Sequence, residues 1–75
     1  MLSYALPRES RVSLKVYSAD GRLVRDLADE YQAPGSHQVV WDGRDGHCRI
    51  LSRGIYYCRL QAGSLGATRK LVKVE

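Results

Sequence analysis

Asp42 and Asp45 are the residues of this 75-residue chain whose types and spacing come nearest to a chemical site. Two carboxylates this close could act as a general acid and base, or as ligands of a calcium ion. Calcium loops take oxygen ligands from several spaced positions, however, and here the cations Arg44 and Arg49 intrude. Aspartates in turns also accept backbone N–H bonds and pair with nearby arginines. We therefore expect both aspartates to be structural, with no metal bound.

Two histidines and two cysteines are the other side chains that could ligate a metal or attack a substrate. His37 and His47 stand alone, with no CxxC or HxxxH pattern beside them, so no zinc site is expected. Cys48 and Cys58 are too few for a disulfide framework, and whether they pair with each other stays open. No serine lies in a G-x-S-x-G context, and a chain this short offers little room for a concave pocket. The chain is thus predicted to be no enzyme and to need no cofactor.

The basic side chains are concentrated in the second part of the chain. Residues 1–43 carry five basic and six acidic side chains, whereas residues 44–75 carry seven basic and two acidic ones. Two interpretations stay open: an ordinary solvated surface, or a basic face that meets an acidic partner such as lipopolysaccharide, nucleic acid or another protein. Nucleic acid is not expected, because the chain has no compact Lys/Arg run and no recognition-helix or RNA-binding signature.

Length and composition predict a single domain that spans residues 1–75. The chain is 44% hydrophobic and 27% charged, which argues against disorder. No apolar run approaches the roughly 18 residues that span a bilayer, so membrane insertion is not expected. Residues 1–6 lack the basic and apolar regions of a signal peptide, so an export signal, if there is one, lies elsewhere.

Apolar and polar residues alternate with a period of two, broken by turn residues about every ten positions. This pattern is typical of a β-sandwich or barrel, and the short connections predict mostly antiparallel sheets. Strands are expected at residues 2–6, 11–17, 23–28, 36–41, 55–62 and 67–74. A tight turn at Asp20-Gly21, a loop over residues 29–35 and a hairpin over residues 63–66 separate some of them.

The alternation also predicts which side chains face inward. The expected core consists of the apolar residues on one face of these strands together with the largest aromatics: Val12, Leu14, Val16, Val24, Trp41, Tyr56, Cys58 and Leu60. Trp41 and Tyr56 could instead form a platform that stacks on sugars or bases, but so small a sandwich needs its aromatics in the core. Tyr17 and Tyr57 should point outward, which makes them candidates for a contact surface.

Several short motifs, taken in order, resemble one known family. They are Val16-Tyr17, Asp20-Gly21-Arg22-Leu23-Val24, Leu27, Ala33, Gly35, His37, Trp41-Asp42-Gly43-Arg44-Asp45, Gly54-Ile55-Tyr56-Tyr57-Cys58-Arg59-Leu60 and Thr68-Arg69-Lys70. The pattern is similar to the Ig-like domain of the flagellar hook-capping protein and to its relative, the C-terminal sorting module of type IX secretion cargo. The chain departs from it twice, since the family usually has glycine at position 48 and an aromatic or polar residue at position 58.

The resemblance implies a seven-stranded Ig-like or fibronectin-III-like β-sandwich, of which the strand pattern accounts for six or seven. It also implies a place at the C-terminus of a large bacterial protein that is secreted or held at the cell surface. The chain ends five residues after Lys70, as the family's natural C-terminus does, and Met1 then reads as an added start codon.

Three functions compete on this basis. The first is a non-catalytic sorting or anchoring tail that contacts the secretion machinery or parent-protein domains through its last two strands. The second is a structural subunit that associates with itself through its edge strands. The third is weak carbohydrate binding through Tyr17, Tyr57 and Trp41. Candidate interaction residues are Arg69, Lys70, Lys73, Tyr17 and Tyr57.

Overall fold

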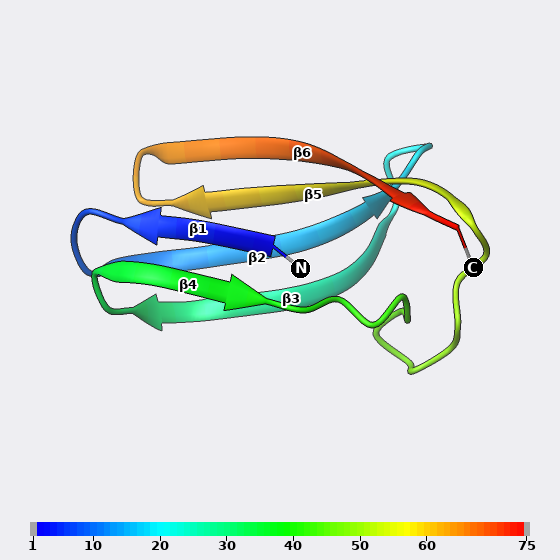
Figure 1. Cartoon of the computed structure of the whole chain (residues 1–75), viewed down its shortest axis with the longest axis horizontal. Helices are drawn as coiled ribbons and strands as arrows, with labels where there is room; N and C mark the ends of the chain where they lie inside the picture. Colours follow the sequence, from blue (N-terminus) through cyan, green and yellow to red (C-terminus); the bar gives the residue numbers. More distant parts are fainter. Residues whose placement is uncertain (1, 75) are drawn as a thin grey trace.

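The computed structural model describes residues 2–74, which form six antiparallel strands in two layers. The strands are β1 (Leu2–Leu6), β2 (Ser10–Ser18), β3 (Leu23–Gln32), β4 (Gly35–Val39), β5 (Gly54–Ala62) and β6 (Leu65–Lys73). One sheet has the order β3-β2-β5-β6, and β1 and β4 pair in front of it as a second sheet (Figure 1). The predicted all-β, antiparallel Ig-like sandwich is thus confirmed. In this part of the chain no helix is long and apolar enough to cross a bilayer.

The strand boundaries differ from the expected ones by more than one residue at three places. β3 continues to Gln32, so the loop expected over residues 29–35 shrinks to Ala33-Pro34. It continues because Asp29 to Gln32 pair in register with Ser13 to Ser10 of β2, although no apolar alternation marks them. β4 ends at Val39 rather than at residue 41, and β6 begins at Leu65. The last hairpin is therefore a two-residue turn, in which Gly63 supplies the positive φ (58°).

The core lies between β2, β5 and β1. Val12, Leu14 and Val16 of β2 are at most 2% exposed, and they face inward by strict alternation. Tyr56, Cys58 and Ala62 of β5 and Leu2 and Leu6 of β1 complete the set of buried apolar side chains. The two layers are also joined by a hydrogen bond that the Tyr4 hydroxyl donates to the Gln32 side chain.

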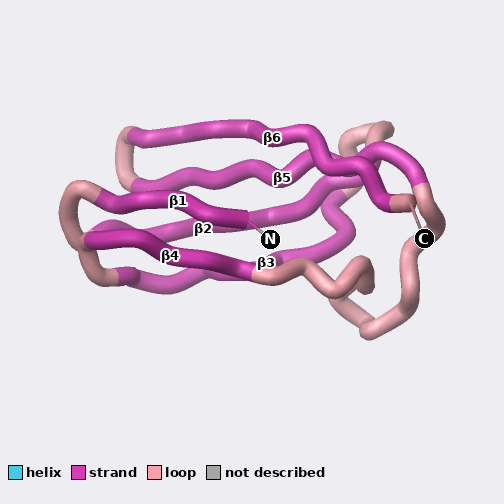
Figure 2. Tube along the Cα trace, viewed as in Figure 1, coloured by secondary structure: helices cyan, strands magenta, loops and turns pink. Residues whose placement is uncertain are grey.

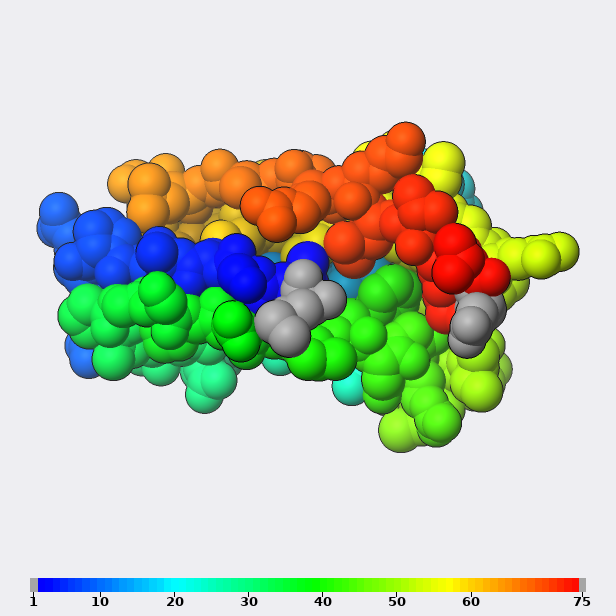
Figure 3. Space-filling model, in the orientation of Figure 1, coloured from blue at the N-terminus to red at the C-terminus, as the bar shows by residue number. Residues whose placement is uncertain are grey.

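Three residues expected in the core are only partly buried: Val24, Trp41 and Leu60. Leu60 is partly exposed because a two-stranded sheet cannot cover the whole inner face of a four-stranded one. Val24 lies where the register of β2 and β3 is interrupted, so strict alternation does not hold there. In the space-filling view, atoms of β5 remain visible between β1 and β6 (Figure 3). Trp41 lies past the end of β4, in the long loop over residues 40–53 that Figure 2 shows at one end of the molecule.

Candidate interaction surface

Asp42 and Asp45 organise the long loop. A carboxylate oxygen of Asp42 accepts the backbone N–H of Arg44 at 3.0 Å and lies 3.4 Å from the guanidinium of Arg25. Asp45 accepts the backbone N–H groups of His47 (2.9 Å) and Arg49 (3.0 Å). The backbone bond from Arg49 lowers the pKa of Asp45 most, with that from His47 and the nearby Arg49 charge adding to it, while desolvation opposes. Both aspartates thus make the backbone N–H bonds expected of aspartates in turns, and both lie near an arginine.

Trp41 and Tyr56 form the aromatic corner under this loop. Their rings meet edge to face, 5.3 Å apart at 66°. Trp41 Nε1 donates to the Arg44 carbonyl at 3.0 Å, and the Tyr56 hydroxyl donates to the Ser52 carbonyl at 2.6 Å. Both polar atoms are used to hold loop backbone. Tyr56 is an inward-facing residue of β5, so this corner lies on the opposite side of the large sheet from Tyr57.

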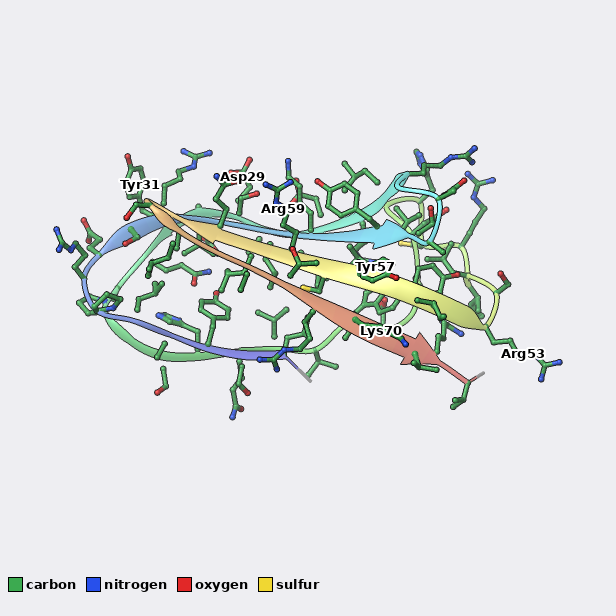
Figure 4. All side chains as sticks on the ribbon, turned by 90° about the horizontal axis from the view of Figure 1, so that it is seen from above. Asp29, Tyr31, Arg53, Tyr57, Arg59 and Lys70 are labelled. Atoms are coloured by element: carbon green, nitrogen blue, oxygen red, sulfur yellow. The ribbon has the colours of Figure 1, made fainter. Side chains whose placement is uncertain are left out.

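Tyr17, Tyr57 and Lys70 come together on the face of the four-stranded sheet that points away from the core. We call this face the outer face. The Cα of Tyr57 lies opposite Tyr17 of β2 on one side and opposite Lys70 of β6 on the other. The three side chains thus form one row across β2, β5 and β6. Arg59 also points away from β1, as do Asp29 and Tyr31 at the other end of this face (Figure 4).

The next row of this face was not singled out from the sequence. Lys15 lies opposite Arg59, which lies opposite Thr68. A shallow hollow of about 110 Å³ is lined by Ser13, Lys15, Tyr17, Arg59 and Gln61. The alternation that places Tyr17 and Tyr57 outward also places Lys15 and Arg59 outward, so the sequence pattern could have predicted that these two cations lie on the same face.

The outer face has an apolar and basic half and an ion-paired half. Ile55 (42% exposed), Tyr57 (37%) and Val72 (64%) are exposed apolar residues in the first half. At the other end, Arg11 Nη2 lies 2.9 Å from Asp29, and its guanidinium stands 5.7 Å from the centre of the Tyr31 ring. The hydrogen bond from Arg11 to Asp29, and then their opposite charges, raise the pKa of Arg11. The charge of Arg11 is therefore already compensated within the chain.

Arg69 and Lys73 do not belong to the outer face, although the sequence grouped them with Lys70. Arg69 lies opposite the inward-facing Cys58, and Lys73 lies opposite Gly54, so both project on the inner side of β6. Consecutive strand residues point to opposite faces, which separates Arg69 from Lys70. Lys73 is also half-buried, because its side chain packs on Gly43; a Cβ added at Gly43 would be 2.7 Å from Lys73 Cε.

The two cysteines are free and lie in different environments. Cys58 is buried, and burial raises the pKa of its thiol. Cys48 is exposed in the long loop and has a positive φ of 64°, a conformation that glycine adopts without strain. The loop thus keeps at Cys48 the left-handed backbone for which the resembling family uses glycine.

Comparison with known proteins gives one family and no individual relative. No curated protein sequence and no solved structure is significantly similar to the chain. The model of the FlgD Ig-like domain matches residues 2–66, which include β1 to β5 and the first two residues of β6. The sandwich, the Trp41-Asp42-Gly43 loop and this match agree: the chain belongs to the FlgD Ig-like domain family.

Proposed function

We propose that this chain is a non-catalytic structural module that binds another protein through the outer face. Membership of the FlgD Ig-like domain family supports a structural and non-enzymatic role. The observation that carries the choice of surface is the row formed by Tyr17, Tyr57 and Lys70 across three strands. Protein interfaces are enriched in aromatic residues and arginine, and their energetic centres are apolar groups surrounded by polar ones.

The composition of the outer face favours an acidic protein as its partner. Lys70 and Arg59 form no ion pair within residues 2–74, whereas Arg11 is paired with Asp29. Beside these cations, Ile55 and Val72 offer apolar area that water now covers. A partner with an apolar patch bordered by carboxylates would bury that area and pair with the free cations.

The experiment is site-specific photo-cross-linking in the source cells. A photoreactive phenylalanine analogue at position 57 should give one discrete cross-linked protein, and the same residue at the exposed position 8 should not. The purified partner should then bind the variant Tyr57→Ala/Lys70→Glu about tenfold or more weakly, because an interfacial aromatic and a charge pair are both lost. Equal cross-linking at both positions, or unchanged binding by the folded variant, would refute the outer face as the binding surface.

A sorting or anchoring role at the cell surface is the second candidate, and the exposed cations of β6 favour it. Arg69 and Lys70 are consecutive exposed residues of the edge strand β6, one on each side of it, and a receptor that grips this edge could reach both. We propose an exported location on this basis. A reporter fused upstream of the chain should lose export or anchoring in Arg69→Glu/Lys70→Glu but keep it in Arg53→Glu. Normal export of the folded double variant would remove the sorting role from β6.

Tyr17, Tyr57 and Trp41 do not form one aromatic surface on which a sugar could stack. Tyr17 and Tyr57 lie on the outer face, whereas Trp41 packs on the inward-facing Tyr56. One sugar ring cannot stack on rings that lie on opposite sides of a sheet.

A further inference from the structure

The two edges of the four-stranded sheet carry opposite charge. β3 and β6 are its outermost strands, as Figure 1 shows, and each pairs on one side only within residues 2–74. β3 presents Asp29 and Glu30 near its end, and β6 presents Arg69 and Lys70 in its middle. Edge strands have free backbone N–H and C=O groups, which can add a further strand.

Only part of each edge is open. The long loop covers the beginning of β3, where the backbone N–H of Gly46 donates to the Val24 carbonyl at 3.0 Å. At the end of β6, the side chain of Lys73 packs on Gly43 of the same loop. The open lengths are therefore residues 28–33 on one edge and residues 65–71 on the other.

We propose that copies of this chain associate head to tail, with the open edge of β6 in one copy pairing with the open edge of β3 in the next. The two strands run antiparallel to each other in the sheet, so a copy displaced sideways without rotation presents its β3 antiparallel to β6. Glu30 stands level with Leu65 of its own copy, so the next copy must also shift by four residues along the strands to place Arg69 opposite Glu30 and Lys70 opposite Asp29. Asp29 already holds Arg11 at 2.9 Å, so the pair of Arg69 with Glu30 is the main attraction.

The faces of the two strands agree with this register. Glu30 lies opposite Val12 and Arg69 opposite Cys58, and both of these neighbours are buried, so Glu30 and Arg69 share the inner side. Asp29 and Lys70 share the outer face in the same way. The register also places Thr68 opposite Tyr31 of the next copy, an aromatic beside a β-branched residue, which is a favourable cross-strand pair.

The charges select this pairing over the alternatives. Two β6 edges would place cations against cations, and two β3 edges would place carboxylates against carboxylates. Charged edge strands normally prevent pairing between sheets. Opposite signs on opposite edges leave one attractive combination, and the partner that carries both edges is a second copy of this chain. Such an interface is not symmetric, so it leads to an open chain of copies or to a ring.

The test uses one charge reversal on each edge, Glu30→Lys and Arg69→Glu, with Arg53→Glu as a control away from both edges. Sedimentation at low salt should show that wild type and Arg53→Glu assemble as concentration rises, and that high salt weakens the assembly. Each edge variant alone should assemble about tenfold or more weakly, because like charges now face each other.

Two further samples separate this interface from a general loss of stability. An equimolar mixture of Glu30→Lys and Arg69→Glu should assemble about as strongly as wild type does, with the two variants alternating. The lysine edge of one variant meets the glutamate edge of the other, and their unchanged edges pair as in wild type. The double variant Glu30→Lys/Arg69→Glu should assemble as wild type does. A wild type that stays monomeric, or a mixture of folded variants that does not associate, would overturn the proposal. Neither changed residue lies on the outer face, so such a failure would leave the proposed function standing.

Discussion

Replacing Trp41 by alanine should lower the free energy of unfolding by about 2–3 kcal/mol. Truncating a fully buried tryptophan costs about 3–5 kcal/mol, and Trp41 is only partly buried, so roughly half of that applies. The edge-to-face contact with Tyr56 and the bond from Nε1 to the Arg44 carbonyl are each worth about 1 kcal/mol, and they make up most of that amount and do not add to it. A domain of this size has a stability of about 4–11 kcal/mol, so the variant should still fold.

Urea unfolding followed by far-ultraviolet circular dichroism measures this loss, since the tryptophan fluorescence is removed with the side chain. Trp41→Phe separates the contributions, because it keeps a ring against Tyr56 and loses the N–H donor. It should lose about 1–1.5 kcal/mol. Tyr57→Ala is the matched control, since it removes an exposed aromatic of the same sheet and should change stability by less than about 0.5 kcal/mol.

The order of the variants in stability tests whether the aromatic corner holds the loop to the sheet. If Trp41→Ala unfolds at the same urea concentration as Tyr57→Ala, the aromatic corner does not hold the loop to the sheet. A loss above about 4 kcal/mol would show instead that Trp41 is as buried as a core residue. Either result would contradict a half-buried Trp41 that packs on Tyr56.

Three other predictions concern the long loop and the thiols. Asp45→Ala should destabilise the chain at neutral pH, and the difference in melting temperature from wild type should shrink as pH falls below about 4. The folded state lowers the pKa of Asp45, so the stability that its carboxylate contributes is present above the unfolded pKa and is lost as the carboxylate protonates. Thermal unfolding at several pH values measures this difference. Cys48→Gly should raise the free energy of unfolding by up to about 1 kcal/mol, since glycine accepts the left-handed φ, and an equal or lower melting temperature would contradict this. Iodoacetamide should modify Cys48 quickly and Cys58 only on unfolding, because burial both shields the Cys58 thiol and raises its pKa; equal rates in the folded protein would be the opposite result.

The sequence predicted best the strands that are buried on one face. In β2, Val12, Leu14 and Val16 alternate with polar residues, and only one orientation of such a strand buries the apolar set. The second half of β3 could not be predicted this way. Asp29 and Glu30 are exposed on an edge strand, so no apolar period marks them, and Gln32 meets the second sheet through the hydrogen bond from Tyr4 and not through an apolar contact.

The candidate surface was predicted in part. Alternation alone places Tyr17 and Tyr57 outward, but their meeting depends on β2 and β5 being neighbours, which a sequence separation of 40 residues does not reveal. The separation of Arg69 from Lys70 could have been seen, because adjacent residues of a strand face opposite sides. The packing of Lys73 on Gly43 depends on the path of the loop, and no local pattern predicts that path.

The long loop determines which parts of the sheet remain free to act. Arg25 donates to the carbonyls of Arg44 (3.2 Å) and Asp45 (3.1 Å), and it lies beside Asp42, so the loop is fastened to the beginning of β3. This fastening covers the edge where β3 begins and leaves its acidic end open. Because the same loop supports Lys73 at the end of β6, the uncovered part of the basic edge is the part that carries Arg69. The loop that carries Trp41, Asp42 and Gly43 thus leaves open the two edge stretches whose charges are complementary, the end of β3 and the middle of β6.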